Sequence, residues 1–384
     1  MVAKSKTPFA RPVRVLVVGQ TPPPYHGQAM MIQMFVDGPH QDIEVRHIRM
    51  AFSRTMDEVG RPGLSKVFHL IALILRIWWS KIRYRPHVLY YPPAGPNRIP
   101  LLRDAIILIA VRPLFRKTVF HFHASGASEI ITTMPKWMKW FIVRALRHPT
   151  AAIRLSQYTI DDSSFIAARR SVIIPNACED HWPRLEQQCI EYRGSSNRPI
   201  QILIIGTVCE TKGILDLLDA CRRLKEKQLS FHLHVVGSFQ PADFEQQVRD
   251  TITAYELQGH TTVHGQLTGD AKWNMLAQTD IFCFPTYYES EGLPVVLIEA
   301  QSLGLPIVST RWRGVPSIVD DSENGFLVEI RDSAALAEQL AKLAADPELR
   351  SRFGESARRK YWTTFTPAAY LRAMDSLIVD VARS

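Results

Sequence analysis

The chain has 384 residues, which exceeds one ordinary hydrophobic core and suits two domains of about 200 residues or fewer. Hydrophobic residues make up 46% and charged residues 22%, which excludes a disordered or fibrous protein. Residues 1–190 carry 26 Lys and Arg against 12 Asp and Glu, whereas residues 191–384 carry 20 against 25. This asymmetry favours one basic face on the first domain and argues against general nucleic-acid binding.

Strand-like and helix-like segments alternate along the first half. Runs of β-branched and aromatic residues predict the strands, and helix-length segments separate them. The predicted strands are Val13–Gly19, Ile43–Ile48, Val88–Tyr91, Thr118–Phe122 and Ala151–Leu155, with helices near 65–84, 98–115, 135–148 and 158–169. This alternation indicates a parallel sheet covered by helices on both faces.

The second half repeats the pattern. Val172–Asn176 ends the first domain, and the polar stretch Glu179–Pro199 is predicted to be a linker with its loop at 194–197. The further strands are Ile200–Gly206, Leu233–Gly237, Thr262–His264, Ile281–Phe284 and Pro306–Ser309, followed by helices at Ser333–Ala345, Pro347–Tyr361 and Pro367–Ala382. We expect two Rossmann-like α/β domains, 1–190 and 191–365, facing across a cleft, with a helix at 366–384 returning to the first.

Two features bear on the compartment. The five cysteines form no C-x-x-C pair and no Cys/His cluster at metal spacing, which favours a reducing cytoplasm. The N-terminus lacks the apolar core of a signal peptide, and no uncharged apolar stretch of ~20 residues occurs. We therefore expect a cytoplasmic protein without a membrane-spanning helix.

Two glutamates, Glu291 and Glu299, are the most informative feature of the second half. Glu291 follows a strand in a turn that contains Gly and Pro, and Glu299 lies inside an apolar helix that is predicted to start near Pro294. A carboxylate on an apolar face is costly unless it is paired, and a helix N-terminus favours an anion such as phosphate. The pattern predicts a phosphorylated ligand with hydroxyl groups, such as a nucleotide sugar.

A third charged residue, Lys212, heads a helix after the strand that ends at Gly206. An isolated lysine in a turn is more often a surface residue. Together with the two glutamates, Lys212 could place a cation beside the phosphates.

These residues belong to an ordered set of motifs that includes Gly304–Val308, Gly314–Val319 and Asn324–Val328. The set covers nearly the whole second half and resembles the retaining glycosyltransferases of family 4, which have the GT-B fold. In the first half the resemblance is looser and rests on the loop containing Gly27, on His121-Phe122-His123 and on Val172–Asn176.

The resemblance implies a role for each matching position. Glu299 would bind the ribose hydroxyls, Glu291 the donor sugar, and Lys212 the leaving diphosphate together with backbone N–H groups. The implied ligands of the nucleotide sugar are Glu299, Lys212, Gly292, Leu293, Val295, Gly27 and Gly206, and the implied catalytic residues are Glu291, His123 and Lys212.

Thr207 departs from the family pattern, which usually has an arginine at this position. Without this arginine, one positive charge fewer is available to stabilise the diphosphate. We hypothesise that Arg311 or Arg313 compensates. Pro294 also lacks the N–H that many relatives offer here.

Three residues of the first domain allow two interpretations each. His121 and His123 end a strand and, at a period of two, point the same way. Buried histidines are more often core residues, but the resemblance favours a role for His123 at the sugar and leaves His121 open. Gly27 either lies near the acceptor and the diphosphate or closes a proline-rich turn.

The expected chemistry needs no metal and no cofactor beyond the sugar nucleotide. No Asp-x-Asp pair occurs, no side chain is well placed as an enzymic nucleophile, and the first loop lacks the G-x-G-x-x-G of dinucleotide enzymes. The resemblance implies that the acceptor hydroxyl attacks the donor sugar on the same face from which the diphosphate departs.

Two basic, tryptophan-containing segments, 66–85 and 135–147, suit an anionic membrane surface. For 67–77 we expect the apolar residues to cover the sheet. For Trp137, Lys139 and Trp140 the membrane and solvent alternatives stay open.

The sequence therefore predicts a retaining glycosyltransferase that moves a sugar to a hydroxyl of a glycan or a lipid-linked acceptor, in cell-surface polysaccharide or glycolipid synthesis. Peripheral association with the inner face of the membrane is expected, and nucleic acid is not a partner. The alternatives are a nucleotide-sugar epimerase of the same fold and a non-catalytic membrane scaffold.

Overall fold

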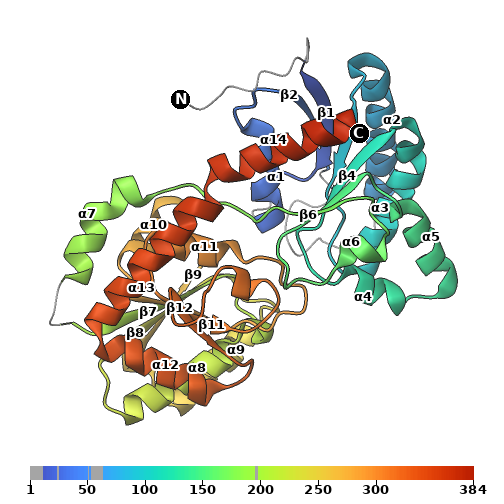
Figure 1. Cartoon of the computed structure of the whole chain (residues 1–384). Helices are drawn as coiled ribbons and strands as arrows, with labels where there is room; N and C mark the ends of the chain where they lie inside the picture. The colour runs from blue at the N-terminus through green and yellow to red at the C-terminus, as the bar shows by residue number, and fades with distance from the viewer. Residues whose placement is uncertain (1–11, 24–25, 51, 53–63, 195–197) are drawn as a thin grey trace, which may run out of the picture. The chain divides into compact units, whose positions relative to one another are not determined.

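The computed structural model describes residues 12–23, 26–50, 52, 64–194 and 198–384, with the side chains of 64–66 excluded. The chain divides into two compact units (Figure 1). The first comprises Met1–Asn176 and Pro367–Ser384, and the second comprises Ala177–Thr366. The second unit thus begins at Ala177, whereas the sequence predicts a boundary after residue 190.

The first unit is built on a six-stranded parallel sheet in the order β2-β1-β3-β4-β5-β6. Its strands are β1 (Val13–Gly19), β2 (Ile43–Arg49), β3 (Val88–Tyr91), β4 (Lys117–His121), β5 (Ala151–Arg154) and β6 (Ser171–Ile173). All four residues of β3 are buried, because helices cover both faces of the sheet. The apolar runs that predict these strands are the consequence of that double burial.

The helices of the first unit form two layers (Figure 1). They are α1 (Gly27–Asp37), α2 (Leu64–Tyr84), α3 (Arg98–Val111), α4 (Ala127–Thr132), α5 (Lys136–Leu146), α6 (Asp162–Phe165) and the C-terminal α14 (Pro367–Arg383). Helices α2, α3 and α5 share one core with the sheet, and α3 packs between the other two. Helix α14 packs on β1 to β4 beside α1. The long helix predicted at 158–169 is wrong, because only α6 forms there.

Specific contacts attach α14 to the first unit. His40 Nδ1 lies 2.8 Å from Asp375 Oδ1, and the side chain of Leu371 fills the space where a Cβ on Gly38 would lie, at 2.6 Å. The last helix therefore completes the core of the first unit although the second unit separates the two in sequence.

Helix α2 contradicts one prediction. Leu73 and Ile77 are buried against the sheet, as expected. Phe68, Ile71 and Leu75, however, are 74%, 52% and 55% exposed. The sequence of α2 is apolar nearly all round its middle, so the sheet covers only one side of it and the remaining apolar side chains face outward.

The second unit contains another six-stranded parallel sheet, in the order β12-β11-β10-β7-β8-β9. Its strands are β7 (Ile200–Ile205), β8 (Phe231–Val236), β9 (Thr261–Gly265), β10 (Ile281–Phe284), β11 (Ile307–Thr310) and β12 (Gly325–Val328). Its helices are α7 (Trp182–Arg193), α8 (Ile214–Glu226), α9 (Phe244–Ala254), α10 (Gly269–Ala277), α11 (Val295–Ser302), α12 (Ser333–Ala345) and α13 (Pro347–Lys360). The strand order reverses between β7 and β10.

The predicted linker at 179–199 is wrong, because most of it is helix α7 of the second unit. Leu185 and Cys189 are buried, and the guanidinium of Arg193 donates hydrogen bonds to the carbonyls of Thr279 and Leu303. The expected loop at 194–197 falls mostly outside the described residues. Two buried apolar positions and the hydrogen-bonded Arg193 attach this helix, most of whose other residues are polar.

Candidate functional site

Two loops meet where the strand order of the second sheet reverses. One follows β7 and spans 206–213; the other follows β10 and spans 285–294. The N–H of Tyr287 donates to the carbonyl of Thr211 at 2.8 Å. Gly213 has φ of +75°, and a Cβ there would lie 2.1 Å from the carbonyl oxygen of Pro285. Only glycine allows this approach, and ligands of such sheets bind at this edge.

The loops bring Lys212 and Glu291 into a direct ion pair between Nζ and Oε2. Their side chains are only 14% and 10% exposed. Thr286 Oγ1 donates to the same carboxylate oxygen at 3.0 Å, and Lys212 Nζ lies 4.6 Å from the centroid of the Tyr288 ring. An ammonium has three N–H donors and Glu291 takes one, so Lys212 can also bind an anion.

Glu299 lies in α11 and is 8% exposed. Lys272 Nζ in the first turn of α10 donates to Oε1 of Glu299 at 2.6 Å. The other oxygen, Oε2, is buried and has no hydrogen-bond partner among the described residues. An unsatisfied buried carboxylate oxygen costs about 1–3 kcal/mol, so this oxygen is suited to a hydroxyl donor from a ligand.

Helix α11 begins at Val295 without a side-chain cap, after Pro294. Its first N–H groups have no intrahelical partner, and the positive end of its dipole favours an anion. The preceding turn is fixed by Gly314, because a Cβ there would lie 2.0 Å from the carbonyl oxygen of Gly292. The structure thus places Gly292, Leu293 and Val295 next to Glu291 in one tight turn.

The backbone next to Thr207 is held by close contacts with the loop after β8. Gly206 has φ of +150° and donates its N–H to Val236, while a Cβ on Gly237 would lie 1.7 Å from the carbonyl oxygen of Gly206. Arg311 pairs with Asp321 and, at 3.6 Å, with Glu329. Two carboxylates therefore already engage the guanidinium of Arg311, and compensation by Arg313 stays a prediction.

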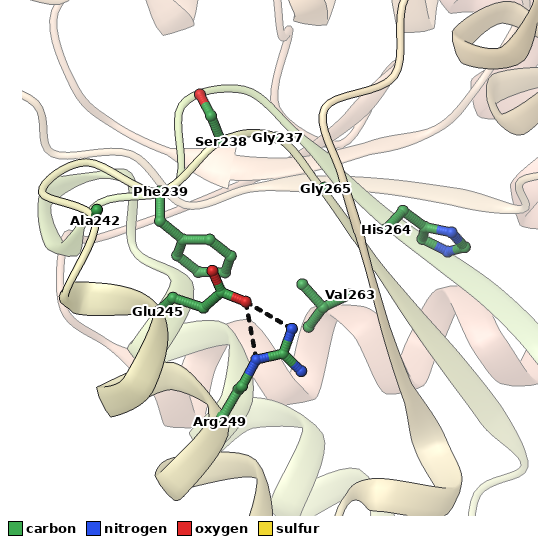
Figure 2. Close-up of a pocket in the computed structure, with 9 residues that line it drawn as sticks. All are labelled: Gly237, Ser238, Phe239, Ala242, Glu245, Arg249, Val263, His264 and Gly265. Carbon is green, nitrogen blue, oxygen red and sulfur yellow. Dashed lines mark hydrogen bonds and ion pairs between the residues drawn. The ribbon is translucent and has the colours of Figure 1, made fainter. Parts of the chain in front are cut away.

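A pocket of about 470 Å³ adjoins Gly237 (Figure 2). It lies at the carboxyl ends of β8 and β9 and at the start of α9, and Figure 2 shows the Glu245–Arg249 ion pair beside the Phe239 ring. The lining residues are Gly237, Ser238, Phe239, Ala242, Glu245, Arg249, Val263, His264 and Gly265. The pocket was not predicted from the sequence; it combines apolar walls with one charged pair.

His121 and His123 are both buried in the first unit. His121 Nδ1 lies 2.7 Å from the hydroxyl of Tyr90, and burial lowers its pKa well below the ordinary value. His123 stacks on His121 with ring centroids 3.9 Å apart, so the two side chains point the same way as predicted. Burial, with a contribution from nearby His26, lowers the pKa of His123 to about 3, while the Asn176 side chain acts in the opposite direction.

Gly27 is the first residue of α1, and His26 caps this helix by accepting the N–H of Ala29 at 3.3 Å. Burial lowers the pKa of His26. The first unit thus gathers two neutral imidazoles, His26 and His123, at the N-terminus of a helix.

The sequence predicted neither the pairing of Lys272 with Glu299 nor the aromatic ring beside Lys212. The buried position of Glu299 indicates that a cation should exist, but Lys272 precedes Glu299 by 27 residues and no spacing rule connects α10 with α11.

A profile of the family described as glycosyl transferases group 1 matches residues 190–360. The putative colanic acid biosynthesis glycosyltransferase WcaL of Escherichia coli (strain K12) is 30% identical over 185 residues, which cover 47% of this chain and 45% of the relative. The amylovoran biosynthesis glycosyltransferase AmsK of Erwinia amylovora is 30% identical over 197 residues, or 50% and 48% of the two chains. The chain spans about half the length of these curated relatives.

Solved structures match over nearly the whole chain. Sucrose-phosphate synthase from Thermosynechococcus elongatus has a TM-score of 0.72 at 17% identity, covering 97% of this chain and 100% of that one. HepE from Anabaena in complex with UDP-glucose has a TM-score of 0.70 at 17% identity, covering 96% and 99%. The predicted α/β fold class, GT-B with two Rossmann-like sheets, is confirmed.

Proposed function

Residues 190–360 match the group 1 glycosyltransferases, and from this premise we propose that the protein transfers a sugar from a nucleotide-diphosphate sugar to a hydroxyl group. One observation carries the proposal. Two ion pairs between a buried glutamate and a half-buried lysine, Lys212–Glu291 and Lys272–Glu299, flank an uncapped helix N-terminus at the edge of the sheet where ligands bind. Carboxylates suit hydroxyl groups, and the ammonium with the helix terminus suits the diphosphate between them.

We assign the roles as follows. Glu299 accepts hydrogen bonds from the ribose through its unpaired Oε2, and Glu291 does so from the donor sugar. Lys212 and the N–H groups of the turn before α11 stabilise the diphosphate as its negative charge grows. Gly206 lets the β7 loop pass close to the ligand, and for the first unit we propose that His123 contacts the sugar and Gly27 the phosphate or acceptor.

The reaction we propose retains the configuration of the sugar and uses no metal. The acceptor oxygen forms a bond to the anomeric carbon while the bond from that carbon to the diphosphate breaks on the same face. The proton of the acceptor hydroxyl passes to an oxygen of the departing diphosphate. Lys212 is the cation in this scheme, and the lack of an Asp-x-Asp pair in the sequence supports it.

The names of the relatives suggest the substrates. The bacterial relatives are named as glycosyltransferases of colanic acid, amylovoran and capsular polysaccharide biosynthesis, and HepE was crystallised with UDP and UDP-glucose. We propose a UDP-sugar as the first donor to test. The proposed acceptor is a glycan or lipid-linked glycan hydroxyl in cell-surface polysaccharide synthesis.

We also propose a cytoplasmic location with peripheral attachment to an anionic membrane surface. The basic balance of residues 1–190 supports this, together with exposed Trp137 and Trp140 on α5, which also carries Lys139. None of the described helices is long and apolar enough to cross a bilayer.

The test is incubation of the protein with a panel of labelled nucleotide sugars, with and without EDTA. The proposal expects release of nucleoside diphosphate from one donor, unaffected by EDTA, and an α-linked product from an α-linked donor. A sugar epimerised on its nucleotide indicates the epimerase. Binding without turnover indicates the scaffold, the alternative that Thr207 favours.

A further inference from the structure

The outer surface of the α2, α3 and α5 layer is unusually apolar. Seven large hydrophobic side chains of α2, three of α3 and two of α5 are exposed, which is twelve of the nineteen in the described residues. These twelve, called the apolar face below, are Val67, Phe68, Ile71, Leu75, Trp78, Trp79, Ile82, Ile99, Ile106, Ile109, Trp137 and Trp140. Single exposed hydrophobic residues need no explanation, but a contiguous set indicates a binding surface.

The α2 part of this face follows helical spacing. Phe68, Ile71, Leu75 and Ile82 recur at intervals of three, four and seven residues, so they lie along one side of the helix. Phe68 and Ile82, towards the two ends, are 74% and 76% exposed. The opposite side of α2 is already used for the core, so the stripe needs a partner of its own.

The tryptophans of α2 are held in place although they are exposed. Trp78 Nε1 donates to the carbonyl of Ala110 at 3.1 Å, and the guanidinium of Arg46 lies 5.5 Å from the Trp79 ring. The surface is therefore formed in advance, and binding does not have to order these large side chains.

The exposed charged side chains on α2, α3 and α5 themselves are basic. Helix α2 carries Arg76, Lys81 and Arg83 and no acidic residue, and α5 carries only basic charged residues. The acidic residue of α3, Asp104, is fully buried and bonded to Arg103. The face therefore presents apolar and cationic groups together.

We infer that the apolar face docks onto an anionic lipid surface, with α2 lying in the plane of the interface and its stripe among the acyl chains. Charge decides between the occupants. A second copy of the chain would bring two purely basic helices together, whereas anionic headgroups complement them. Tryptophan beside Lys and Arg on one helix face is typical of an interfacial helix. The inference rests on the proposed membrane attachment and assigns it to α2 as the main contact.

The experiment measures co-sedimentation of the protein with vesicles of phosphatidylcholine alone or with phosphatidylglycerol added. We expect binding to the anionic vesicles that weakens with salt, and at least a tenfold loss of affinity in the triple variant Phe68→Ser, Ile71→Ser, Ile82→Ser. The control variant Tyr158→Ser, Ile190→Ser changes exposed residues elsewhere and should bind like wild type. Charge is tested by Arg76→Glu with Arg83→Glu, against Lys227→Glu in the second unit.

Three results would overturn the inference. These are wild type remaining in the supernatant with anionic vesicles, the triple variant binding as well as wild type, and a wild-type dimer in sedimentation velocity that the triple variant abolishes. Each variant is also titrated with UDP. A triple variant that loses lipid binding at unchanged UDP affinity supports the inference. If none of the proteins binds UDP, this counts against the proposed sugar transfer, and the lipid measurement still tests the membrane inference independently.

Discussion

Lys272 Nζ lies 2.6 Å from one oxygen of Glu299, and the other oxygen is buried without a partner in the described chain. Oε1 of Glu299 is therefore paired inside the protein, and Oε2 is the oxygen that we propose binds the nucleotide. For Glu299→Gln we expect the Kd for UDP to rise about 10- to 100-fold, because a hydrogen bond to a charged group contributes about 1.5–3 kcal/mol. Isothermal titration with UDP measures this.

A matched variant separates binding from folding. Lys272→Met leaves the Glu299 carboxylate buried and unpaired, which should lower the free energy of unfolding by about 3–5 kcal/mol. In the double variant Lys272→Met, Glu299→Gln the thermal stability should recover, while the UDP affinity should stay low. Recovery of both would show that Glu299 only supports the fold.

Lys212 should act on the leaving group. For Lys212→Met we expect kcat to fall about 10²- to 10³-fold, the usual effect of losing one group that stabilises transition-state charge. Because this variant leaves Glu291 without its cation, Lys212→Met with Glu291→Gln serves as the stability control. A melting temperature restored in the double variant while kcat remains low supports the assignment; a normal kcat in a folded Lys212→Met protein contradicts it.

The missing arginine at Thr207 can be supplied. Thr207→Arg should raise kcat for donor cleavage or tighten UDP binding, since it adds a positive charge beside the β7 loop. In the wild-type protein, Arg313→Ala should lower kcat and weaken UDP binding. The same substitution should have less effect in the Thr207→Arg background. Steady-state kinetics of the four proteins test this, and an Arg313→Ala protein with unchanged donor affinity and activity excludes Arg313.

His121 and His123 should respond differently to substitution although their rings are stacked. His121 bonds the hydroxyl of Tyr90, so His121→Gln should lower the melting temperature and leave kcat nearly unchanged. His123→Gln should lower kcat at nearly constant melting temperature, because we propose that His123 contacts the donor sugar. The reverse pattern would assign His123 to the core.

A chain of hydrogen bonds predicts acid sensitivity in the second unit. His234 Nδ1 lies 2.9 Å from His264 Nε2, and its Nε2 lies 2.7 Å from Gln201 Oε1. Burial, with the nearby charges of His232 and His264, lowers the pKa of His234 to about 4. The unfolded chain therefore binds an extra proton between pH 6.5 and 4, so the stability is complete above pH 6.5 and decreases as the pH falls through this range.

Urea unfolding between pH 7.5 and 4.5 measures this loss, which is at most about 1.4 kcal/mol per pH unit for one histidine. The His234→Gln variant should show a flatter profile. His260→Gln, outside the hydrogen-bonded chain, should keep the wild-type slope. An identical slope in His234→Gln would show that another group titrates.

Much of the fold could be predicted from the sequence because parallel strands are buried on both faces. Val88–Tyr91 and Ile281–Phe284 are strands with the predicted bounds for this reason. Helix α7 was missed because only Leu185 and Cys189 of it are buried, which is too few to give a clear period. The outward stripe of α2 was missed because an apolar helix does not indicate which of its sides meets the sheet.

The candidate site was predictable only in part. Glu291, Glu299 and Lys212 follow from local motifs, since each lies in a loop or helix with a recognisable neighbourhood. Lys272 could not be found, because its pairing with Glu299 depends on how α10 packs beside α11. The pairing of Lys212 with Glu291, 79 residues later, likewise depends on the adjacent positions of β7 and β10.

Hydrogen–deuterium exchange with and without UDP tests the central claim most directly, because it locates the donor site without relying on activity. The account predicts slower exchange in 206–213, 285–294 and the first turn of α11 when UDP, or the UDP-sugar that supports turnover, is bound. Protection confined to other segments, or none with any nucleotide sugar of the panel, would contradict it.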